Sequence, residues 1–329
     1  MMNHWSSTAS IETLKTRARI IQTIRAFFHA RQVWEVETPI LSHSGNPDPN
    51  IESFRVNTPL SNHAYLQTSP EFAMKRLLAN NSGPIYQLCK VFRAGEIGQN
   101  HNPEFTMLEW YRPGYDYHQL MQEVDALIRT ALDHLKLEAS QFLSYRTLFQ
   151  QYVDIDPFTA ECETLALLIK RAKIDVEGMN DASRDSWLNL ILTHLIEPAL
   201  PLNCPIFIYD FPQSQASLAK IRNAKPTESN QAAPAVAERF ELYINGMELA
   251  NGFSELTDAS EQQKRFNKEN QQRKQQGQQT VKLDQYFLQA LEAGLPESAG
   301  VAVGIDRLIM LATQTKYISA VIAFDDPRS

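Results

Sequence analysis

The dipeptide Asn245-Gly246 is the feature that most narrows the folds open to this chain. Both central positions of a two-residue hairpin turn need a positive φ, and Asn followed by Gly meets that need well. The dipeptide lies between two strand-like runs, 238–244 and 247–253. The sequence therefore predicts an antiparallel hairpin at this point of the chain.

The rest of the chain mixes strand-like and helical runs without a regular strand-helix-strand order. Runs of strand type cover 32–41, 85–93, 105–111, 205–211 and 317–324. Helical spacing or composition marks 11–31, 70–79, 117–137, much of 146–200, 258–279 and 305–313. The stretch 46–59 and the polar stretch 221–235 are expected to be loops. This order, with no Gly-rich phosphate loop, predicts an α+β fold with an antiparallel β-sheet flanked by helices.

Charge and hydrophobicity exclude two classes of partner. The 329 residues carry 31 Lys and Arg against 38 Asp and Glu, a net charge of -7. Such a chain has no broad attraction for nucleic-acid backbones or anionic membranes. No run approaches the roughly 18 to 20 apolar residues that a membrane span needs. We therefore expect a cytoplasmic protein that does not bind a membrane and is unlikely to bind tRNA through a strongly basic surface.

Two glutamates of the expected hairpin form a candidate metal site. A two-residue turn pairs Tyr243 with Glu248, and strand alternation places Glu241 on the same face as Tyr243. Glu241 and Glu248 then lie diagonally across one face, within reach of a hard cation that prefers carboxylate oxygen. The alternative is a pair of glutamates on a solvated sheet face.

The other expected hairpin carries a candidate ammonium site and a candidate anion site. Glu109 and Tyr111 share a strand face, where a carboxylate and a phenol together suit an ammonium ligand. Arg93 ends the preceding strand, and Arg307 follows Gly304 at an expected helix start, where anions are favoured. The alternative for each of these residues is an ordinary surface ion pair.

Together these segments resemble a known enzyme family. The stretch FRAGEIGQNHNPEFTMLEWY (92–111) resembles motif 2 of class II aminoacyl-tRNA synthetases, with HNPEFTMLE similar to the lysyl branch. GVAVGIDRLIML (300–311) resembles motif 3, ERFELYINGMELANGFSEL (238–256) also resembles the lysyl branch, and the segment ending at Pro39 resembles motif 1. The resemblance implies one class II catalytic domain over 1–329. Motif 1 would lie at about 11–41, motif 2 at about 85–111 and motif 3 at about 299–313. It also implies a homodimer formed through motif 1.

On this resemblance the site would activate an amino acid with ATP and Mg²⁺. Arg93 would bridge the amino-acid carboxylate and the ATP α-phosphate, and Arg307 would hold the γ-phosphate, so both are the expected catalytic residues. Further ATP contacts are expected at Ala94, Gly95, Glu96, His101, Asn102, Phe105 (stacked on adenine), Glu248, Leu249 and Gly304. The expected substrate-binding residues are Ser69, Pro70, Glu71, Glu109, Tyr111, Asn251, Glu255 and Ala302. The expected metal ligands are Glu241 and Glu248.

Three positions depart from the family pattern or from regular geometry. In motif 2 the family has Arg, any residue and then Glu, and this glutamate contacts adenine. Here Gly95 stands at the position of the glutamate, and Glu96 follows it. Glu96 is therefore the candidate replacement for the adenine contact. The lysyl Gly-Leu-Gly of motif 3 ends here in Ala302, whose methyl group would narrow the amino-acid pocket. Regular alternation puts Glu255 on the face opposite Glu248, so either a bulge at Gly252 redirects the chain or Glu255 has another role.

The acceptor of the activated amino acid is inferred from what the chain lacks. Motif 1 lies so close to the first residue that we expect no anticodon-binding domain. The short length, YRPGYD after motif 2, FPQSQASLA and Ala302 are similar to bacterial elongation factor P lysine ligases. This likeness implies transfer of (R)-β-lysine, or lysine, to a lysine ε-amine of elongation factor P. The alternatives are a truncated synthetase that charges tRNA and an inactive synthetase paralogue with a regulatory role.

Overall fold

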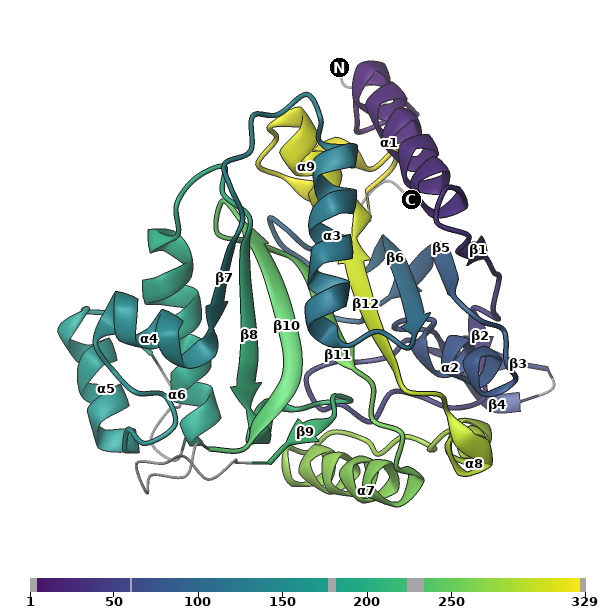
Figure 1. Cartoon of the computed structure of the whole chain (residues 1–329). Coiled ribbons are helices and arrows are strands. Elements are labelled where there is room, and N and C mark those ends of the chain that lie inside the picture. Colours follow the sequence, from purple (N-terminus) through teal and green to yellow (C-terminus); the bar gives the residue numbers. More distant parts are fainter. Residues whose placement is uncertain (1–4, 60, 177–181, 224–233, 326–329) are drawn as a thin grey trace. The chain divides into compact units, whose positions relative to one another are not determined.

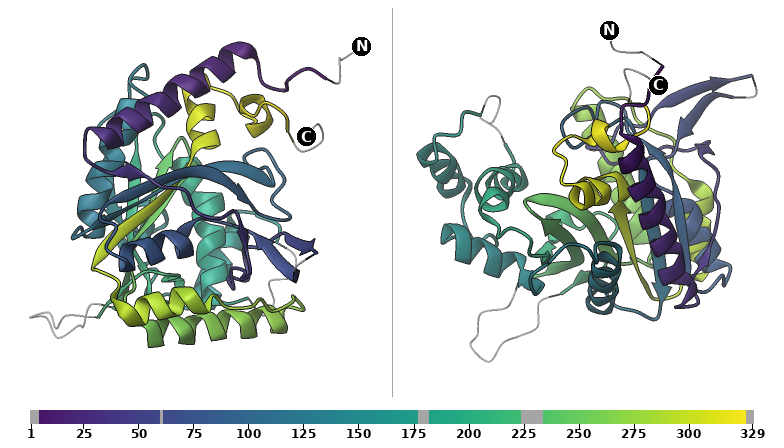
Figure 2. Two further views of the ribbon diagram at one scale, coloured as in Figure 1. Left: turned by 90° about the vertical axis from the view of Figure 1, so that its right-hand side faces the viewer. Right: turned by 90° about the horizontal axis from the view of Figure 1, so that it is seen from above.

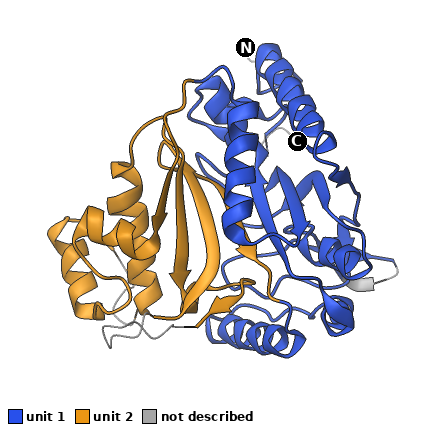
Figure 3. Ribbon diagram, viewed as in Figure 1, with its two compact units in different colours: residues 1–135, 257–329 blue, residues 136–256 orange. Residues whose placement is uncertain are grey.

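The computed structural model describes residues 5–59, 61–176, 182–223 and 234–325. The chain divides into two compact units, one of residues 1–135 with 257–329 and one of residues 136–256 (Figure 3). Figure 1 labels the helices and strands of both units. Each unit is described by itself, and the expectation of a single catalytic domain stays a prediction.

The first unit contains a run of strands in the order β1-β5-β6-β12. β1 pairs with β5 in parallel, whereas β6 pairs antiparallel with both β5 and β12. Their bounds are β1 (Trp34–Glu35), β5 (Ile85–Phe92), β6 (Glu104–Pro113) and β12 (Ser298–Gly304). A separate sheet has the order β2-β4-β3, with bounds β2 (Leu41–Ser42), β3 (Arg55–Thr58) and β4 (Ser61–Leu66). The expected antiparallel arrangement of the two motif 2 strands is confirmed.

Helices surround these strands in the first unit. They are α1 (Ile11–His29), α2 (Glu71–Ala79), α3 (Tyr117–Ala131), α7 (Ala259–Gln275), α8 (Gln285–Gly294), α9 (Ile305–Thr313) and a short 3₁₀ helix (Ile318–Val321). α1 begins at Ser10, whose hydroxyl accepts a hydrogen bond from the Thr13 N–H as an N-cap. α1 packs against α3 and α9 (Figure 2). Its Phe28 ring stacks on Tyr86 of β5, with ring centres 4.4 Å apart, so the helix is anchored on the sheet by aromatic packing.

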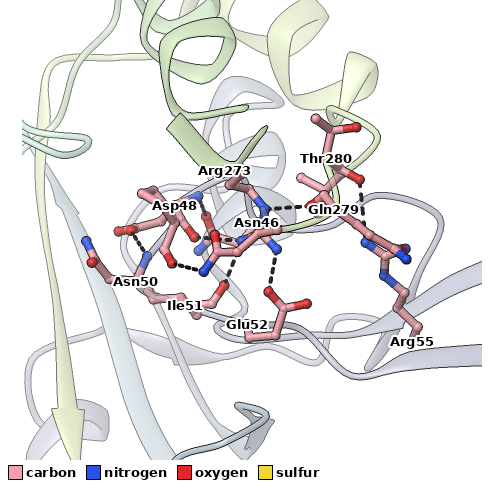
Figure 4. A network of polar contacts seen from close by, with 12 residues as sticks. Asn46, Asp48, Asn50, Ile51, Glu52, Arg55, Arg273, Gln279 and Thr280 are labelled. Carbon is pink, nitrogen blue, oxygen red and sulfur yellow. Dashed lines mark hydrogen bonds and ion pairs between the residues drawn. The ribbon is translucent and has the colours of Figure 1, made fainter. Parts of the chain in front are cut away.

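A buried arginine anchors α7 (Figure 4). The Arg273 side chain is completely buried, and its guanidinium donates to the backbone carbonyls of Gln279 (2.8 Å) and Asp48 (3.1 Å) and to the Glu52 carboxylate. The Glu52 carbonyl in turn accepts a hydrogen bond from the Ala94 N–H at 2.8 Å. Arg273 therefore fixes the loop that lies beside motif 2, because a buried guanidinium needs several acceptors at once.

The second unit contains strands in the order β11-β10-β8-β7, with β9 paired to β10. The strands are β7 (Gln141–Ser144), β8 (Ile206–Pro212), β9 (Ile221–Arg222), β10 (Val236–Ile244) and β11 (Met247–Ser254). The helices are α4 (Tyr145–Val153), α5 (Cys162–Arg171) and α6 (Arg184–Ile191), followed by a π-helical turn (Leu192–Ile196) and a 3₁₀ turn (Glu197–Ala199); a further 3₁₀ turn (Gln213–Gln215) follows β8. Apolar residues of these helices pack against β8 and β10 to form the core of the unit, including Tyr145, Leu148, Ile191, Ile206 and Phe211.

The hairpin predicted at Asn245-Gly246 is confirmed. Both turn residues have positive φ, 55° and 70°, and Tyr243 pairs with Glu248. β10 and β11 then lose their register by one residue, because Leu242 pairs with Ala250 and leaves Leu249 without a partner strand residue. This bulge changes which residues of β11 share a face with Glu248.

Several sequence expectations need correction. The expected strand over 317–324 is wrong: this segment contains the 3₁₀ helix, and its apolar residues reflect burial, since Val321 is fully buried. Of the expected strand over 32–41, only β1 and the first residue of β2 are strand, whereas the expected loops over 46–59 and 221–235 contain β3 and β9. Residues 224–233 of the loop expected over 221–235 lie outside the described part of the chain. None of the described helices is long and apolar enough to cross a membrane.

We predict that Arg273→Met lowers the free energy of unfolding by about 3 kcal/mol, because it leaves buried carbonyls and the Glu52 carboxylate without their donor. Urea unfolding measures the loss. The control is Lys274→Met at the next, exposed position of α7, which should change stability by less than about 0.5 kcal/mol. Equal effects of the two substitutions would contradict the anchoring role of Arg273.

Candidate active site

Arg93 lies where β5 ends, among other motif 2 residues of the first unit. Its guanidinium carbon is 5.2 Å from the centre of the Phe105 ring, and its Nη1 is 3.6 Å from Oε1 of Glu96. Its Nε donates to the Thr68 carbonyl at 3.4 Å. These partners hold the guanidinium over an aromatic ring, an arrangement that suits a bound nucleotide.

Gly95 and Glu96 stand where the family pattern has its glutamate, and Gly95 has a backbone conformation that favours glycine. Its φ of +81° lies in the left-handed region, which a glycine adopts without strain. The turn that follows from this geometry brings Glu96 into contact with Arg93. The expected contact of Glu96 with adenine stays a prediction.

Arg307 and His101 contact each other through their side chains. Nη2 of Arg307 lies 2.7 Å from Nε2 of His101, and Nε of Arg307 donates to the Asn100 carbonyl at 3.3 Å. Burial lowers the pKa of His101, and the charge of Arg307 lowers it further. A neutral His101 accepts the hydrogen bond from Arg307. Nearby, the Asn102 amide donates to the Glu104 carbonyl at 2.7 Å, which orders the same loop.

Asp306, directly before Arg307, is almost fully buried and connects all three sequence motifs. Its Oδ1 accepts from Nη1 of Arg17 in α1 at 2.5 Å, and its Oδ2 accepts from the Thr106 N–H in β6 at 2.6 Å. Nη2 of Arg17 also donates to the Thr106 hydroxyl at 2.6 Å. This closed network fixes the start of α9, and with it the backbone that carries Arg307.

Glu109 and Tyr111 form the expected acidic and phenolic pair. The Tyr111 hydroxyl donates to Oε1 of Glu109 at 2.6 Å, and both side chains are buried. Ala302 of β12 pairs directly with Glu109, so both lie on one face of the strands. Gly304 pairs with Met107 and then forms the N-cap of α9. The structure therefore brings together the ammonium-binding candidates and the methyl group that distinguishes motif 3.

The residues expected near the substrate amino group lie at the start of α2. The Ser69 hydroxyl accepts from the Glu71 N–H at 3.4 Å, and Pro70 directly precedes the helix. Oε1 of Glu71 accepts from Nζ of the buried Lys75 at 2.6 Å. Lys75 thereby orients the carboxylate that is expected to meet the substrate.

The second unit contains the two candidate metal ligands, and Arg239 orients one of them. The Arg239 guanidinium donates to Oε1 of Glu241, and the Tyr243 hydroxyl donates to Oε2 of Glu241 at 2.7 Å. Nε of Arg239 also donates to Oδ1 of Asn251 at 3.2 Å. Arg239 therefore links an expected metal ligand to an expected substrate-binding residue on one face of the hairpin.

Negative charge accumulates around Glu241. Burial raises the pKa of Glu241, an effect that Arg239 opposes and Glu248 reinforces. Burial together with Glu248 and Glu241 raises the pKa of Glu197 to about 7. In the described part of the chain, no three acidic, histidine or cysteine side chains form a complete metal cage. Two carboxylates with excess negative charge fit Mg²⁺, which commonly completes its shell with water and phosphate oxygens.

The bulge at Leu249 resolves the position of Glu255. Glu241 pairs with Asn251, and Tyr243 pairs with Glu248, so all four residues share a face. In a regular strand, residues 248 and 251 would lie on opposite faces, because they are an odd number of positions apart. Gly252 pairs regularly with Phe240, so the bulge proposed at Gly252 is wrong in position. β11 does change phase, but at Leu249, and this change puts the buried Glu255 in phase with Asn251. The role of Glu255 in binding an ammonium stays a prediction.

Sequence reasoning missed several residues that orient the site. Arg239 precedes Glu241 by two positions on a strand, so strand alternation puts the two on one face. Arg17 precedes the buried Ile20 by three positions on a helix, so helical spacing puts it on the buried face. Both residues could have been found in this way. Glu197 lies far away in sequence, and no local pattern indicates that it adjoins the carboxylates of the hairpin.

The lowered pKa of His101 predicts a pH-dependent loss of stability. As the pH falls below the ordinary pKa of 6.5, His101 binds a proton in the unfolded chain but not yet in the folded protein, where its pKa is lower. The free energy of unfolding therefore falls as the pH falls. His101→Gln keeps an acceptor for Arg307 but cannot be protonated. Urea unfolding from about pH 8 to about pH 5 should show a smaller loss for the variant. Parallel losses in the two proteins would contradict the prediction.

Comparisons with known proteins agree with this geometry. The family model described as tRNA synthetases class II (D, K and N) matches residues 2–328. The chain is 50% identical to the elongation factor P–(R)-β-lysine ligase of Pseudoalteromonas translucida (strain TAC 125), over 100% of this chain and 99% of the relative. It is 50% identical to the ligase of that name from Proteus mirabilis (strain HI4320), over 97% of each chain. The corresponding protein of Histophilus somni (strain 2336) is 48% identical, over 98% of this chain and 97% of the relative. The chain therefore belongs to the class II tRNA synthetases of the D, K and N group.

Proposed function

We propose that this chain activates (R)-β-lysine, or lysine, with ATP and transfers it to the ε-amino group of a lysine of elongation factor P. The observation that carries the proposal is the full-length likeness to ligases of that name. The site fits this chemistry. Arg93 and Arg307 are cations for a nucleotide, and Glu109 with Tyr111 offers acceptors for an ammonium.

In the first step, a carboxylate oxygen of the amino acid attacks the α-phosphorus of ATP, and pyrophosphate leaves. Arg93 binds the carboxylate and the α-phosphate together and stabilises the charge that develops there. Arg307 binds the γ-phosphate; its side chain contacts His101, and the hydrogen bonds of the preceding residue, Asp306, fix its backbone. The product is an aminoacyl-adenylate, and no protein nucleophile is needed.

In the second step, the neutral ε-amine of the acceptor lysine attacks the acyl carbon of the adenylate. An amide bond forms, the bond to AMP breaks, and the attacking amine loses a proton. AMP and the modified factor are the products. A protein acceptor also fits the net charge of -7, which gives the chain no broad attraction for tRNA.

Glu241 and Glu248 would hold Mg²⁺, which would neutralise phosphate charge when bound. Arg239 supports this role, because it fixes the Glu241 carboxylate. The remaining proposed ATP contacts are Ala94, Gly95, Glu96, His101, Asn102, Phe105, Leu249 and Gly304. The remaining proposed substrate contacts are Ser69, Pro70, Glu71, Asn251 and Glu255.

Ala302 supports the preference for β-lysine over α-lysine. It lies directly across from Glu109, so its methyl group occupies the row of residues that carries the ammonium-binding carboxylate. A substrate whose amino group is moved by one carbon would fill such a pocket differently. One methyl group is typically worth about 1 to 3 kcal/mol of discrimination.

A homodimer through the motif 1 segment is part of the proposal. Large apolar side chains of this segment are exposed, including Ile11 (64%), Trp34 (52%) and Leu41 (45%). Such exposure fits an interface with a second copy. A cytoplasmic location follows from the proposed acceptor, a translation factor.

Intact-mass measurement of elongation factor P tests the donor and the acceptor together. Incubation with the enzyme, ATP and (R)-β-lysine should add one β-lysyl group, and lysine should react more slowly. A factor with its acceptor lysine replaced by arginine serves as the control. Charging of bulk tRNA at a comparable rate would favour the truncated-synthetase alternative instead.

Arg93→Ala and Arg307→Ala should each slow amino-acid-dependent exchange of pyrophosphate into ATP by about 1,000-fold, because each removes a cation that stabilises the transition state. Arg129→Ala removes an arginine that pairs with Asp125 on α3, and it should leave exchange unchanged. Thermal melting of each variant checks the fold. Near wild-type exchange in either site variant would rule out its assigned role. Absence of exchange in the parent protein would favour the inactive paralogue.

A further inference from the structure

Gln87 lies in the same cross-strand row as the proposed ammonium-binding residue. It pairs with Glu109 on β6, and Glu109 pairs with Ala302 on β12. Directly opposed residues of antiparallel strands share a face, with Cβ atoms about 4.5 to 5.5 Å apart. The carboxamide of Gln87 is therefore a neighbour of the Glu109 carboxylate on the β5 side. On the β12 side, Ala302 has no polar side-chain atom.

The Gln87 side chain is buried with an unused acceptor. It is 3% exposed, and no hydrogen-bond donor within the described part of the chain reaches its Oε1. The amide also hydrogen-bonds Cys89, two positions along the same strand and on the same face. That bond uses the nitrogen end of the amide and leaves the carbonyl for another donor.

A buried carbonyl without a donor is unfavourable, so a site that keeps one is suited to a ligand that supplies the donor. A primary ammonium carries three N–H donors. Glu109 supplies one acceptor, and the oxygen of Tyr111, whose own proton goes to Glu109, supplies another. The carbonyl of Gln87 is a third acceptor on the same face, and it adds no negative charge to the pocket.

We propose that Gln87 is a substrate-binding residue that sets the preference for a primary ammonium, through a hydrogen bond from the side-chain ammonium of the amino acid to Oε1. The assignment rests on the proposed function, because it needs a lysine-type substrate. It also places that ammonium on the β5 side of Glu109 rather than over Ala302.

Gln87→Met tests the assignment, because it keeps the length of the side chain and removes the acceptor. In pyrophosphate exchange, the KM for (R)-β-lysine should rise by about 10- to 100-fold, as expected for a lost hydrogen bond to a charged group. The KM for ATP should stay within about twofold of wild type. The midpoint of thermal unfolding should change little, since the removed carbonyl had no partner within the described residues and only the weak hydrogen bond to Cys89 is lost. Gln87→Glu restores an acceptor and should recover part of the affinity.

Gln67→Met is the matched control. Gln67 is also buried, but its amide donates to the Lys90 carbonyl at 2.9 Å. Its loss should lower the unfolding midpoint and leave the KM for (R)-β-lysine unchanged. An unchanged KM in Gln87→Met, with exchange intact in the parent, would overturn the Gln87 assignment alone. No exchange in the parent with either lysine isomer would overturn the proposed function and this inference together.

Discussion

The buried carboxylate of Asp306 is the interaction on which the first unit depends most. It accepts hydrogen bonds from Arg17 and from the backbone of Thr106, and so joins α1, β6 and α9. Loss of one partner would leave a buried charge uncompensated, which typically costs about 3 to 5 kcal/mol. The position of Asp306 in the first turn of α9 adds a favourable interaction with the helix dipole. One ionised side chain thus holds the elements of all three motifs together, and the next residue along the chain is Arg307.

Charge is distributed differently in the two units. In the first unit, Arg93 lies 3.6 Å from the Glu96 carboxylate, and Arg307 contacts the imidazole of His101 at 2.7 Å. In the second unit, Glu197 and Glu241 have raised pKa values because burial and neighbouring carboxylates disfavour their charged forms. Each set of side chains favours a ligand of opposite charge.

The sequence predicted local features far better than long-range ones. The turn at Asn245-Gly246, and with it the pairing of Tyr243 with Glu248, follows from backbone preferences that two residues determine. The helices expected over 11–31 and 258–279 are found as α1 and α7, and the side chains of Ser10 and Asp258 cap their first turns. The apolar run over 317–324 contains a 3₁₀ helix and not the expected strand, because burial and strand formation favour the same residue types. Networks such as the one around Asp306 join residues hundreds of positions apart and leave no local pattern.

The bulge at Leu249 shifts the alternation of side chains along β11 by one residue. Glu248, an even-numbered residue, lies on the face shared with Glu241. Beyond Leu249 the residues on that face are odd-numbered, so Asn251 lies there. If the same sequence alternated strictly beyond Glu248, with Leu249 paired to Leu242, the two faces of the rest of β11 would be exchanged. Ala250 and Gly252 would then lie on the face of Glu241, and Asn251 would lie on the opposite face. The face on which Asn251 lies is thus set by the number of residues between Glu248 and Asn251 as much as by their identity.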